Sequence, residues 1–415
     1  MADKQLAKKI INVFTDIACA FVKRDEKMVV VGGWYGDRFC DNSKAIYLFL
    51  TENKEKFGLD RVIWHTRNDD VYNQLKRDGY DVEKIGTRAA RKSSIKAKYQ
   101  LIDSCGVDID RLFSGSAVRL EMWHAFPVKR FGGLNEFEKG GIKEAVNTNI
   151  HRSELGRWSY FYCLSMSQKH SEINQQAFGV NEEHCIIGPY PRVTYLKGEI
   201  GRYMLDCEKE TMKKLESLRA QGKRVVGYFP TFRDDTEKND ITIETVEKLV
   251  EWAKDNNCCI MTKMHYASSR EAGGDDDLLI ALPPASDVYN FIQLADIMIS
   301  DYSSIVFDYL IMDRPIIFYC FDYDYYLNKD RGFAIDYDIS AAGAKVYNWD
   351  ELISAINTAL EDPRAYTESY ADKTERLWNV ITDPDTREAT PEQLETFWKK
   401  LYAKDKTEKL RKIKD

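Results

Sequence analysis

The stretch Ile297–Leu310 reads IMISDYSSIVFDYL, and it decides the fold class. Its first part, Ile297–Ser300, has the apolar character of a buried strand, and a helical pattern follows it directly. Free backbone N–H groups at a helix start favour an anion, and Ser303 and Ser304 would add hydroxyl donors in the first turn. The segment Asp301–Ser304 therefore predicts either a phosphate site or an ordinary helix cap, because Asp and Ser are also the usual capping residues.

Short β-rich segments alternate with helical segments on both sides of this stretch, which predicts parallel sheets with crossover helices. The alternation occurs in two series, separated by the Gly- and Pro-rich region Gly188–Arg202. We therefore expect an α/β protein with Rossmann-like domains at residues 1–194 and 195–385 and a helical tail at 386–415. The expected strands are Met28–Val31, Arg61–His65, Asp81–Ile85, Leu112–Ser114, Phe161–Ser165 and Cys185–Ile187, then Arg224–Phe229, Cys258–Lys263, Leu278–Ala281, Ile297–Ser300 and Pro315–Phe318.

Composition excludes several classes of protein. A net charge of −7 over 415 residues argues against a nucleic-acid binder. The nine cysteines lack metal-ligand spacing and indicate reduced thiols in a cytoplasmic protein. No signal peptide or membrane-spanning run is expected. The basic amphipathic segment Leu6–Val22 predicts a helix that either packs on its own domain or attaches the protein peripherally to the cytoplasmic face of a membrane.

Polar residues that follow predicted strands are the candidates for chemistry, because ligands of parallel sheets bind beyond the carboxyl ends of the strands. In Met122–Lys129, His124 could remove a proton and Lys129 could hold a phosphate, although a structural histidine beside a tryptophan is the alternative. Other strand ends carry Thr231 and Arg233, or Lys263 and His265, which suit an anionic ligand or an ordinary solvated end. The remaining candidates are Gly33, Trp34, Asp41 and Asn42 in a glycine-containing loop, where Asp41 or Ser43 could cap the following helix, and Arg331 beside a tyrosine cluster.

Five short motifs, which are listed at the end of this paragraph in chain order, resemble those of the CDP-glycerol glycerophosphotransferase family. This family includes teichoic-acid primases and polymerases that use CDP-glycerol or CDP-ribitol. The resemblance extends from about Val29 to Asp336. The family's usual first block is Trp-His-Gly-Thr-Pro-Leu-Lys, and here Ala125 and Phe126 replace its small and hydroxyl residues. The matching motifs are Asn42-Ser43, Trp123–Lys129 (WHAFPVK), Pro230–Asp234 (PTFRD), Ser300–Ser304 (SDYSS) with Phe307-Asp308, and Arg331–Phe333 (RGF).

The resemblance implies a GT-B architecture, in which two Rossmann-like domains flank an interdomain cleft that holds the active site. It implies catalytic histidines at His124 and His265, and a CDP donor held mainly by the C-terminal domain. The donor-binding residues would be Thr231, Arg233, Lys263, Asp301, Ser303, Ser304 and Arg331, and the acceptor-side residues Gly33, Trp34, Asp41, Asn42 and Lys129.

The reaction implied by the resemblance is phosphoryl transfer. An acceptor hydroxyl attacks the β-phosphorus of a CDP-polyol, CMP leaves, and His124 acts as the general base. The implied acceptor is a lipid-linked saccharide or a growing glycopolymer at the inner face of a bacterial membrane, in cell-wall or capsule synthesis. Mg²⁺ is compatible with this chemistry, but no dedicated ligand cluster is present in the sequence, so no cofactor is predicted.

Two other functions fit the same features. A nucleotide-sugar glycosyltransferase can have the same architecture, because fold alone does not separate the two reactions. A non-catalytic binding protein could also have kept the fold, and the altered pair Ala125-Phe126 is the feature that favours this alternative.

Overall fold

The computed structural model describes residues 21–104, 107–110, 116–134, 160–196, 202–231, 233, 236–263, 278–329 and 333–412. Its contacts divide the chain into two compact units. Unit 1 comprises Met1–His124, Gly132–Thr194 and Thr382–Asp415, and unit 2 comprises Ala125–Phe131 and Tyr195–Ile381. The short segment 125–131 therefore belongs to unit 2, although its neighbours in sequence belong to unit 1.

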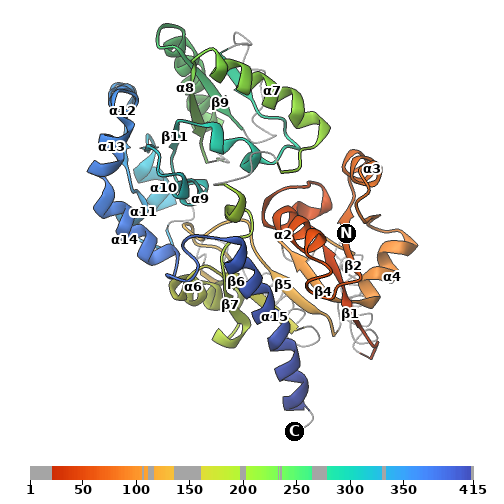
Figure 1. Ribbon diagram of the computed structural model, residues 1–415. Helices are drawn as coiled ribbons and strands as arrows, with labels where there is room; N and C mark the ends of the chain where they lie inside the picture. The colour runs from red at the N-terminus through yellow and green to blue at the C-terminus, as the bar shows by residue number, and fades with distance from the viewer. Residues whose placement is uncertain are drawn as a thin grey trace. The chain divides into compact units, whose positions relative to one another are not determined.

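Unit 1 is built on a parallel sheet that contains seven strands within the described residues, in the order β3-β2-β1-β4-β5-β6-β7 (Figure 1). Its first four members in space follow the order 3-2-1-4 that is typical of Rossmann-like sheets. The direction of the sheet's connections reverses between β1 and β4, where Val29 pairs with Tyr99. The strands are β1 Asp25–Val31, β2 Arg61–Thr66, β3 Val82–Lys84, β4 Ala97–Ile102, β5 Val118–Glu121, β6 Tyr160–Ser165 and β7 Cys185–Ile187.

The helices of unit 1 begin where local sequence supplies a cap. The side chains of Asn68, Thr87 and Ser167 each accept a backbone N–H at the start of α3, α4 and α6. Helix α15 begins at Pro391, within the predicted helical tail, and Thr390 accepts from the N–H of Gln393 at 3.3 Å. The α-helices of this unit are α2 Asp41–Glu52, α3 Asp69–Arg77, α4 Arg88–Lys96, α6 Gln168–Phe178 and α15 Pro391–Lys412, with short 3-10 turns at Trp34–Gly36, Gly132–Leu134, Glu182–His184 and Val193–Tyr195, the last of which ends in unit 2.

The carboxyl-terminal helix α15 packs on unit 1 through buried apolar residues. Trp398 is buried, and its ring lies 5.2 Å from that of Tyr99 in β4. Gly188, just after β7, is in contact with the ring of Phe397, and a Cβ at this glycine would lie 2.4 Å from that ring. The close approach explains why a glycine occupies the end of β7.

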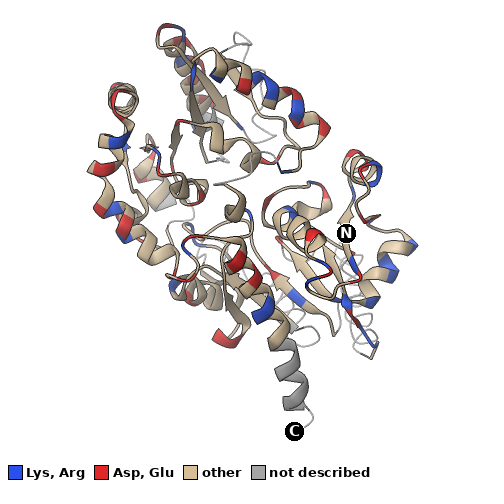
Figure 2. Ribbon diagram, viewed as in Figure 1, with Lys and Arg blue, Asp and Glu red and all other residues tan. Residues whose placement is uncertain are grey.

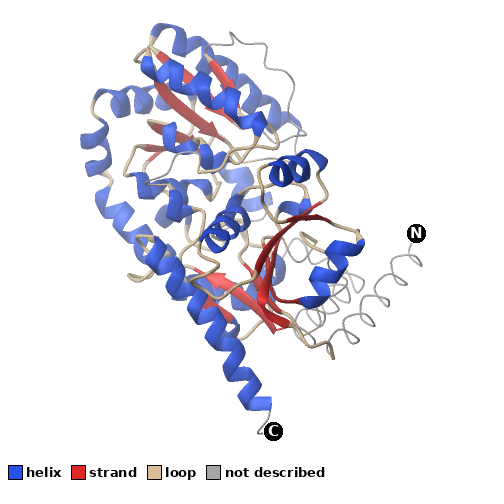
Figure 3. Cartoon of the chain, turned by 45° about the vertical axis from the view of Figure 1, so that its right-hand side comes forward, coloured by secondary structure: helices blue, strands red, loops and turns tan. Residues whose placement is uncertain are grey.

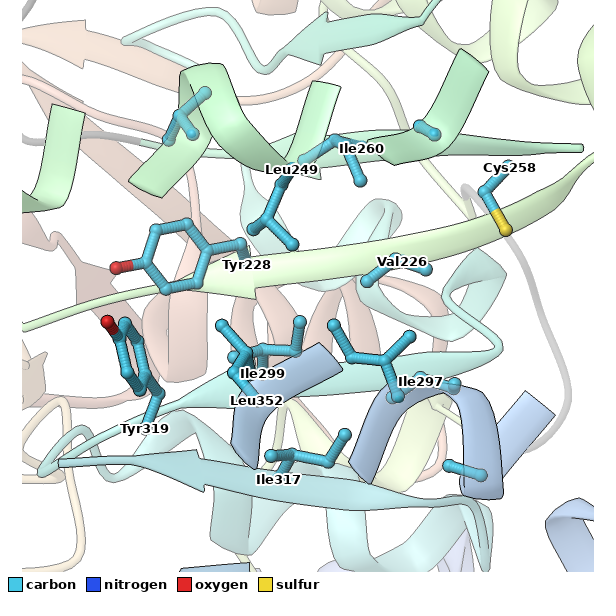
Figure 4. Packing of buried hydrophobic residues seen from close by; sticks show 14 of the residues in the cluster. Val226, Tyr228, Leu249, Cys258, Ile260, Ile297, Ile299, Ile317, Tyr319 and Leu352 are labelled. Atoms are coloured by element: carbon cyan, nitrogen blue, oxygen red, sulfur yellow. The ribbon is translucent and has the colours of Figure 1, made fainter. Parts of the chain in front are cut away.

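Unit 2 repeats the same topology with a second parallel sheet, which has six strands among the described residues in the order β10-β9-β8-β11-β12-β13. In order of appearance along the chain this is again 3-2-1-4-5-6, and the reversal lies between β8 and β11. Figure 4 shows the core of this sheet, in which Ile299 and Leu352 lie close together. The strands are β8 Arg224–Phe229, β9 Cys258–Thr262, β10 Leu279–Ala281, β11 Ile297–Ser300, β12 Ile316–Tyr319 and β13 Ala344–Val346.

Helices follow the strands of unit 2 as crossovers, and Figure 3 shows them in blue beside the red strands. Acidic and basic residues both occur along these helices, as α7 and α14 show in Figure 2. None of the described helices is long and apolar enough to cross a membrane. The α-helices are α7 Asp206–Ala220, α8 Thr236–Asp255, α9 Ile305–Tyr309, α10 Tyr323–Lys329, α11 Tyr337–Ser340, α12 Trp349–Glu361, α13 Pro363–Ser369 and α14 Ala371–Ile381, with 3-10 turns at Val288–Asn290, Ile292–Leu294 and Leu310–Met312.

The strand predictions hold with three exceptions. The expected strand Leu112–Ser114 lies outside the described residues and stays a prediction. Strands β4 and β5 were not predicted, because they carry buried polar side chains such as Gln100 and Arg119, which hydrogen bond to each other at 3.3 Å. The three-residue β13 was not predicted either, since so short a run gives no periodicity.

Candidate active site

The PTFRD and SDYSS motifs meet at the carboxyl ends of β8 and β11. Phe229 pairs with Ser300, so the residues that follow the two strands lie at the same edge of the sheet. The backbone N–H of Thr231 donates to both carboxylate oxygens of Asp301, at 2.8 and 3.1 Å. This edge is the reversal point of the sheet, which is where ligands of such folds bind.

Arg233 joins this edge to the loop after β12. Its guanidinium is 2% exposed and forms a fork with Asp322, from Nε at 2.6 Å and Nη2 at 2.9 Å. The same group donates to Asp301 at 2.8 Å and to the carbonyl of Thr231 at 2.8 Å. Arg233 therefore donates four hydrogen bonds to groups of the protein itself. These bonds hold together the loops that follow β8, β11 and β12. Asp322 was not predicted from the sequence, although it stands in the tyrosine-rich block after a predicted strand.

The two serines of the DYSS segment stand immediately before α9. The helix begins at Ile305, so both serines precede its first turn, where they were expected to lie, and Ser304 makes no side-chain cap. Asp301 does not cap the helix either, because its carboxylate is occupied by Thr231, Arg233 and the N–H of Tyr302 at 2.6 Å. The hydroxyls of Ser303 and Ser304 have no hydrogen-bond partner among the described residues, and both side chains are half-buried. The capping alternative is therefore wrong for these residues.

Lys129 lies with these residues in unit 2, although the sequence suggested the acceptor side. The carbonyl of Val128 accepts from the N–H of Ala334 at 2.7 Å, and this pairing fixes the segment 125–131 on unit 2. Lys129 Nζ then reaches Thr231 Oγ1 at 3.4 Å and lies 5.4 Å from the ring centre of Tyr326. The cation is thus placed beside the strand end that carries Thr231.

Phe126 anchors the same segment. Its buried ring packs edge-on against Phe307 of α9, with ring centres 5.5 Å apart. The unusual phenylalanine in the WHAFPVK motif therefore joins this motif to the helix that follows the DYSS segment. This role could not be predicted from the sequence, because the contact joins two motifs that are remote along the chain.

Lys263 lies just after β9 and donates to the carbonyl of Ser286 and, at 3.4 Å, to its hydroxyl. It faces the loop after β10 (Leu279–Ala281). Two other predicted residues, His265 and Arg331, lie outside the described residues.

His124 belongs to unit 1, where its ring contacts those of two tryptophans. The ring centres of Trp123 and Trp34 are 4.4 and 5.4 Å away. Its Nδ1 is 3.4 Å from the carbonyl oxygen of Asp103, which suits an N–H donation from Nδ1 and leaves Nε2 as the basic nitrogen. Burial lowers the pKa of His124, with Arg192 acting in the same direction, so the imidazole is neutral near pH 7 and can accept a proton.

The glycine-containing loop after β1 packs closely behind His124. A Cβ at Gly33 would lie 2.7 Å from Ser43 Oγ and 3.0 Å from Asp103, so only glycine fits there. Burial and the neighbouring Asp41 raise the pKa of the Asp103 carboxyl, which accepts from the N–H of Ser43 at 3.1 Å. Neither Asp41 nor Ser43 caps α2, whose N-cap residue is Cys40.

Asp41 and Asn42 instead hold the residues around His124. Asp41 accepts from Trp34 Nε1 at 3.1 Å, and Asn42 Nδ2 donates to the carbonyl of Trp123 at 2.9 Å. Backbone strain is concentrated here, because Trp34, Asp41 and Trp123 all have positive φ angles, of 46°, 66° and 56°. Within the described ranges, no group of three or more His, Cys, Asp or Glu residues has an arrangement that could hold a metal ion.

Comparison with known proteins supports a single family. The model of the family CDP-Glycerol:Poly(glycerophosphate) glycerophosphotransferase matches residues 16–389. A teichoic acid glycerol-phosphate transferase of Staphylococcus aureus is 26% identical over 380 residues, which cover 88% of this chain and 93% of that protein. A teichoic acid ribitol-phosphate polymerase of the same species is 27% identical over 312 residues, covering 69% and 53% of the two chains.

The fold is also shared with a solved structure. The wall teichoic acid polymerase TagF superposes with a TM-score of 0.71 at 21% sequence identity, over 95% of this chain and 94% of that chain. The motifs, the two α/β units and the family match agree with one another. The chain therefore belongs to the CDP-glycerol:poly(glycerophosphate) glycerophosphotransferase family, and the polyol-phosphate transferase predicted from its motifs is confirmed.

Proposed function

We propose that this enzyme transfers glycerol phosphate or ribitol phosphate from a CDP-activated donor to a hydroxyl of a glycan or polyol-phosphate acceptor, in the synthesis of a teichoic-acid-type polymer. The observation that carries the proposal is the meeting of Thr231 and Asp301 at the reversal point of the second sheet, beside two serine hydroxyls that have no partner among the described residues. The names of the related transferases supply both polyols.

The donor diphosphate would lie at the carboxyl edge of β8 and β11. Ser303 and Ser304 offer hydroxyls that serve no structural bond among the described residues. Lys129 offers a cation next to Thr231. Charge-assisted hydrogen bonds of this kind are strong phosphate contacts. Arg233 and Asp301 would position the loop from within, since their polar groups are already paired with each other.

The group that activates the acceptor would lie on unit 1. The acceptor hydroxyl attacks the β-phosphorus, the bridging P–O bond to CMP breaks, and His124 Nε2 takes the hydroxyl proton. A neutral imidazole fits this role, and the lowered pKa of His124 keeps it neutral at physiological pH. His265 and Arg331 would assist on the donor side, and Lys263 would add positive charge there.

The two units would form a GT-B enzyme whose active site lies in the cleft between them. This proposal is supported by the 3-2-1-4 strand order in each sheet and by the division of the motifs, with the His124 group on one unit and the DYSS group on the other. The acceptor would be lipid-linked or polymeric, and the protein would bind the cytoplasmic face of the membrane peripherally through the basic segment Leu6–Val22.

A donor screen tests this function. Purified protein is titrated with CDP-glycerol, CDP-ribitol and a UDP-sugar while thermal unfolding is followed, because a ligand that binds only the native state raises the midpoint. We expect stabilisation by one or both CDP-polyols and none by the UDP-sugar. Stabilisation by the UDP-sugar alone would identify a glycosyltransferase.

A further inference from the structure

Arg192, in the turn before Val193, is a buried cation that the proposed chemistry does not yet use. Its side chain is 2% exposed, and its Nη1 is 2.5 Å from Asp41 Oδ1. The same Nη1 donates to the backbone carbonyl of His124 at 2.9 Å. The ion pair is therefore fixed directly to the backbone of the candidate base.

A second contact supports the same backbone. Asn42 accepts from the N–H of Arg192 at 3.3 Å and donates from Nδ2 to the carbonyl of Trp123 at 2.9 Å. The carbonyls of Trp123 and His124 are thus both held by side chains from outside their own segment. Since Trp123 has a φ of 56° and Asp41 one of 66°, these bonds stabilise conformations that are otherwise unfavourable for residues with side chains.

The position of His124 in the chain makes this support necessary. Residue 124 is the last of its segment in unit 1, and residue 125 already belongs to unit 2. A side chain at such a crossing needs anchors on its own unit to keep a defined orientation. Arg192 and Asn42 are the anchors that the described structure shows for the carbonyls of His124 and Trp123.

We propose that Arg192, paired with Asp41, is a positioning residue for His124 that fixes the orientation of its imidazole and sets its charge environment. The proposal rests on the proposed role of His124 as general base. In the sequence, Arg192 follows Pro189 and Pro191, and this context indicated only a domain boundary.

Asp41 and Arg192 shift the pKa of the His124 imidazole in opposite directions. Burial is the largest cause of the lowered pKa of His124, Asp41 raises it, and Arg192 lowers it. The other ionisable groups near the ring are Asp103, whose backbone carbonyl meets Nδ1, Glu121, which accepts from the N–H of Trp123 at 3.2 Å, and Arg38, which lies over Trp34 at 5.0 Å. Removing one member of the pair should therefore shift the titration of His124 in a predictable direction.

The test is an NMR titration of the histidine side chains in the full chain, which has six histidines, with the His124 signal assigned from its loss in His124→Gln. We expect Arg192→Met to raise the pKa of His124 and Asp41→Asn to lower it. An unchanged titration in both variants, or shifts in the same direction, would overturn the proposal. The readout needs no turnover, so it remains valid even if wild-type protein releases no CMP and the proposed function fails.

Kinetics of conservative and charge-balanced variants complete the test. Arg192→Lys keeps the charge but not the geometry of the guanidinium, and we expect kcat to fall about tenfold with KM for the donor unchanged. The double variant Asp41→Asn/Arg192→Met removes both charges, so it should fold even if the single variants do not. We expect it to lose at least about tenfold in kcat, because His124 is no longer held. A folded double variant with wild-type kcat would overturn the positioning role.

A matched control is Arg24→Met. Arg24 is also a buried arginine of unit 1 that donates to backbone carbonyls, at Ala97 and Ser94, but it lies just before β1, at the opposite ends of the strands. We expect this variant to leave the titration of His124 unchanged. An equal shift in Arg24→Met would mean that the effect reports general loosening of unit 1 and would contradict the specific assignment.

Discussion

The backbone N–H of Thr231 donates to both carboxylate oxygens of Asp301, although the two residues are 70 positions apart in the sequence. This contact makes one cluster out of two motifs that each look like an ordinary strand end. The cluster leaves the hydroxyls of Ser303 and Ser304 without a structural partner among the described residues. The groups that brace this edge are thus distinct from the hydroxyls that a ligand could use.

The brace itself can be tested by removing Arg233. Arg233→Met would leave Asp301 and Asp322 buried without their cation, and we expect a loss of about 3–5 kcal/mol in the free energy of unfolding. Urea denaturation measures this loss. The control is Arg364→Met, which removes an exposed pair with Glu368 and should cost less than about 1 kcal/mol. Equal effects in the two variants would contradict the bracing role.

The two serines should affect donor binding without affecting stability. In Ser303→Ala/Ser304→Ala we expect the free energy of unfolding to stay within about 0.5 kcal/mol of wild type, because neither hydroxyl caps α9. The Kd for CDP-glycerol, measured by calorimetry, should rise at least about tenfold. If stability falls by about 1 kcal/mol and affinity is retained, the serines are caps.

Lys129 should act on the donor. We expect Lys129→Met to raise the Kd for CDP-glycerol about tenfold or more, since a charged contact to phosphate is lost beside Thr231. The matched control is Lys27→Met, which removes an exposed lysine that is 3.7 Å from Asp60. Normal donor affinity and weakened acceptor binding in Lys129→Met would contradict this prediction. That result would show that Lys129 contributes to acceptor binding.

Unit 1 should be labile in acid because of His170. Burial lowers its pKa from 6.5 to about 3, so the folded state resists a proton that the unfolded state accepts. Stability should therefore be complete above pH 6.5 and fall as the pH drops toward 3, by about 2 kcal/mol at pH 5. Chemical denaturation of wild type and His170→Asn at pH 7 and pH 5 measures this contribution. If His170→Asn loses as much free energy of unfolding between pH 7 and pH 5 as the wild type does, His170 is not the cause of the acid lability.

Local patterns predicted most of the fold but not the pairing of polar groups. The strands β7, β8 and β11 have the bounds expected from their apolar runs. The strands β4 and β5 escaped prediction because buried polar residues interrupt their apolar pattern. The candidate site was predicted as a set of strand ends, whereas its internal contacts depend on tertiary structure. Arg192 and Asp322 act through partners that are far away in sequence, and a motif read alone cannot reveal such partners.

The central claim is that the bond broken in the donor is the one between its β-phosphorus and the bridging oxygen, which leaves with CMP. The most direct measurement uses CDP-glycerol with a ³²P label on the β-phosphorus, a polyol-phosphate acceptor, and either wild-type enzyme or His124→Ala. We predict that the wild type moves the label to the acceptor and releases unlabelled CMP, and that His124→Ala binds the donor but transfers no label. Release of labelled CDP, or full transfer by His124→Ala, would contradict the account.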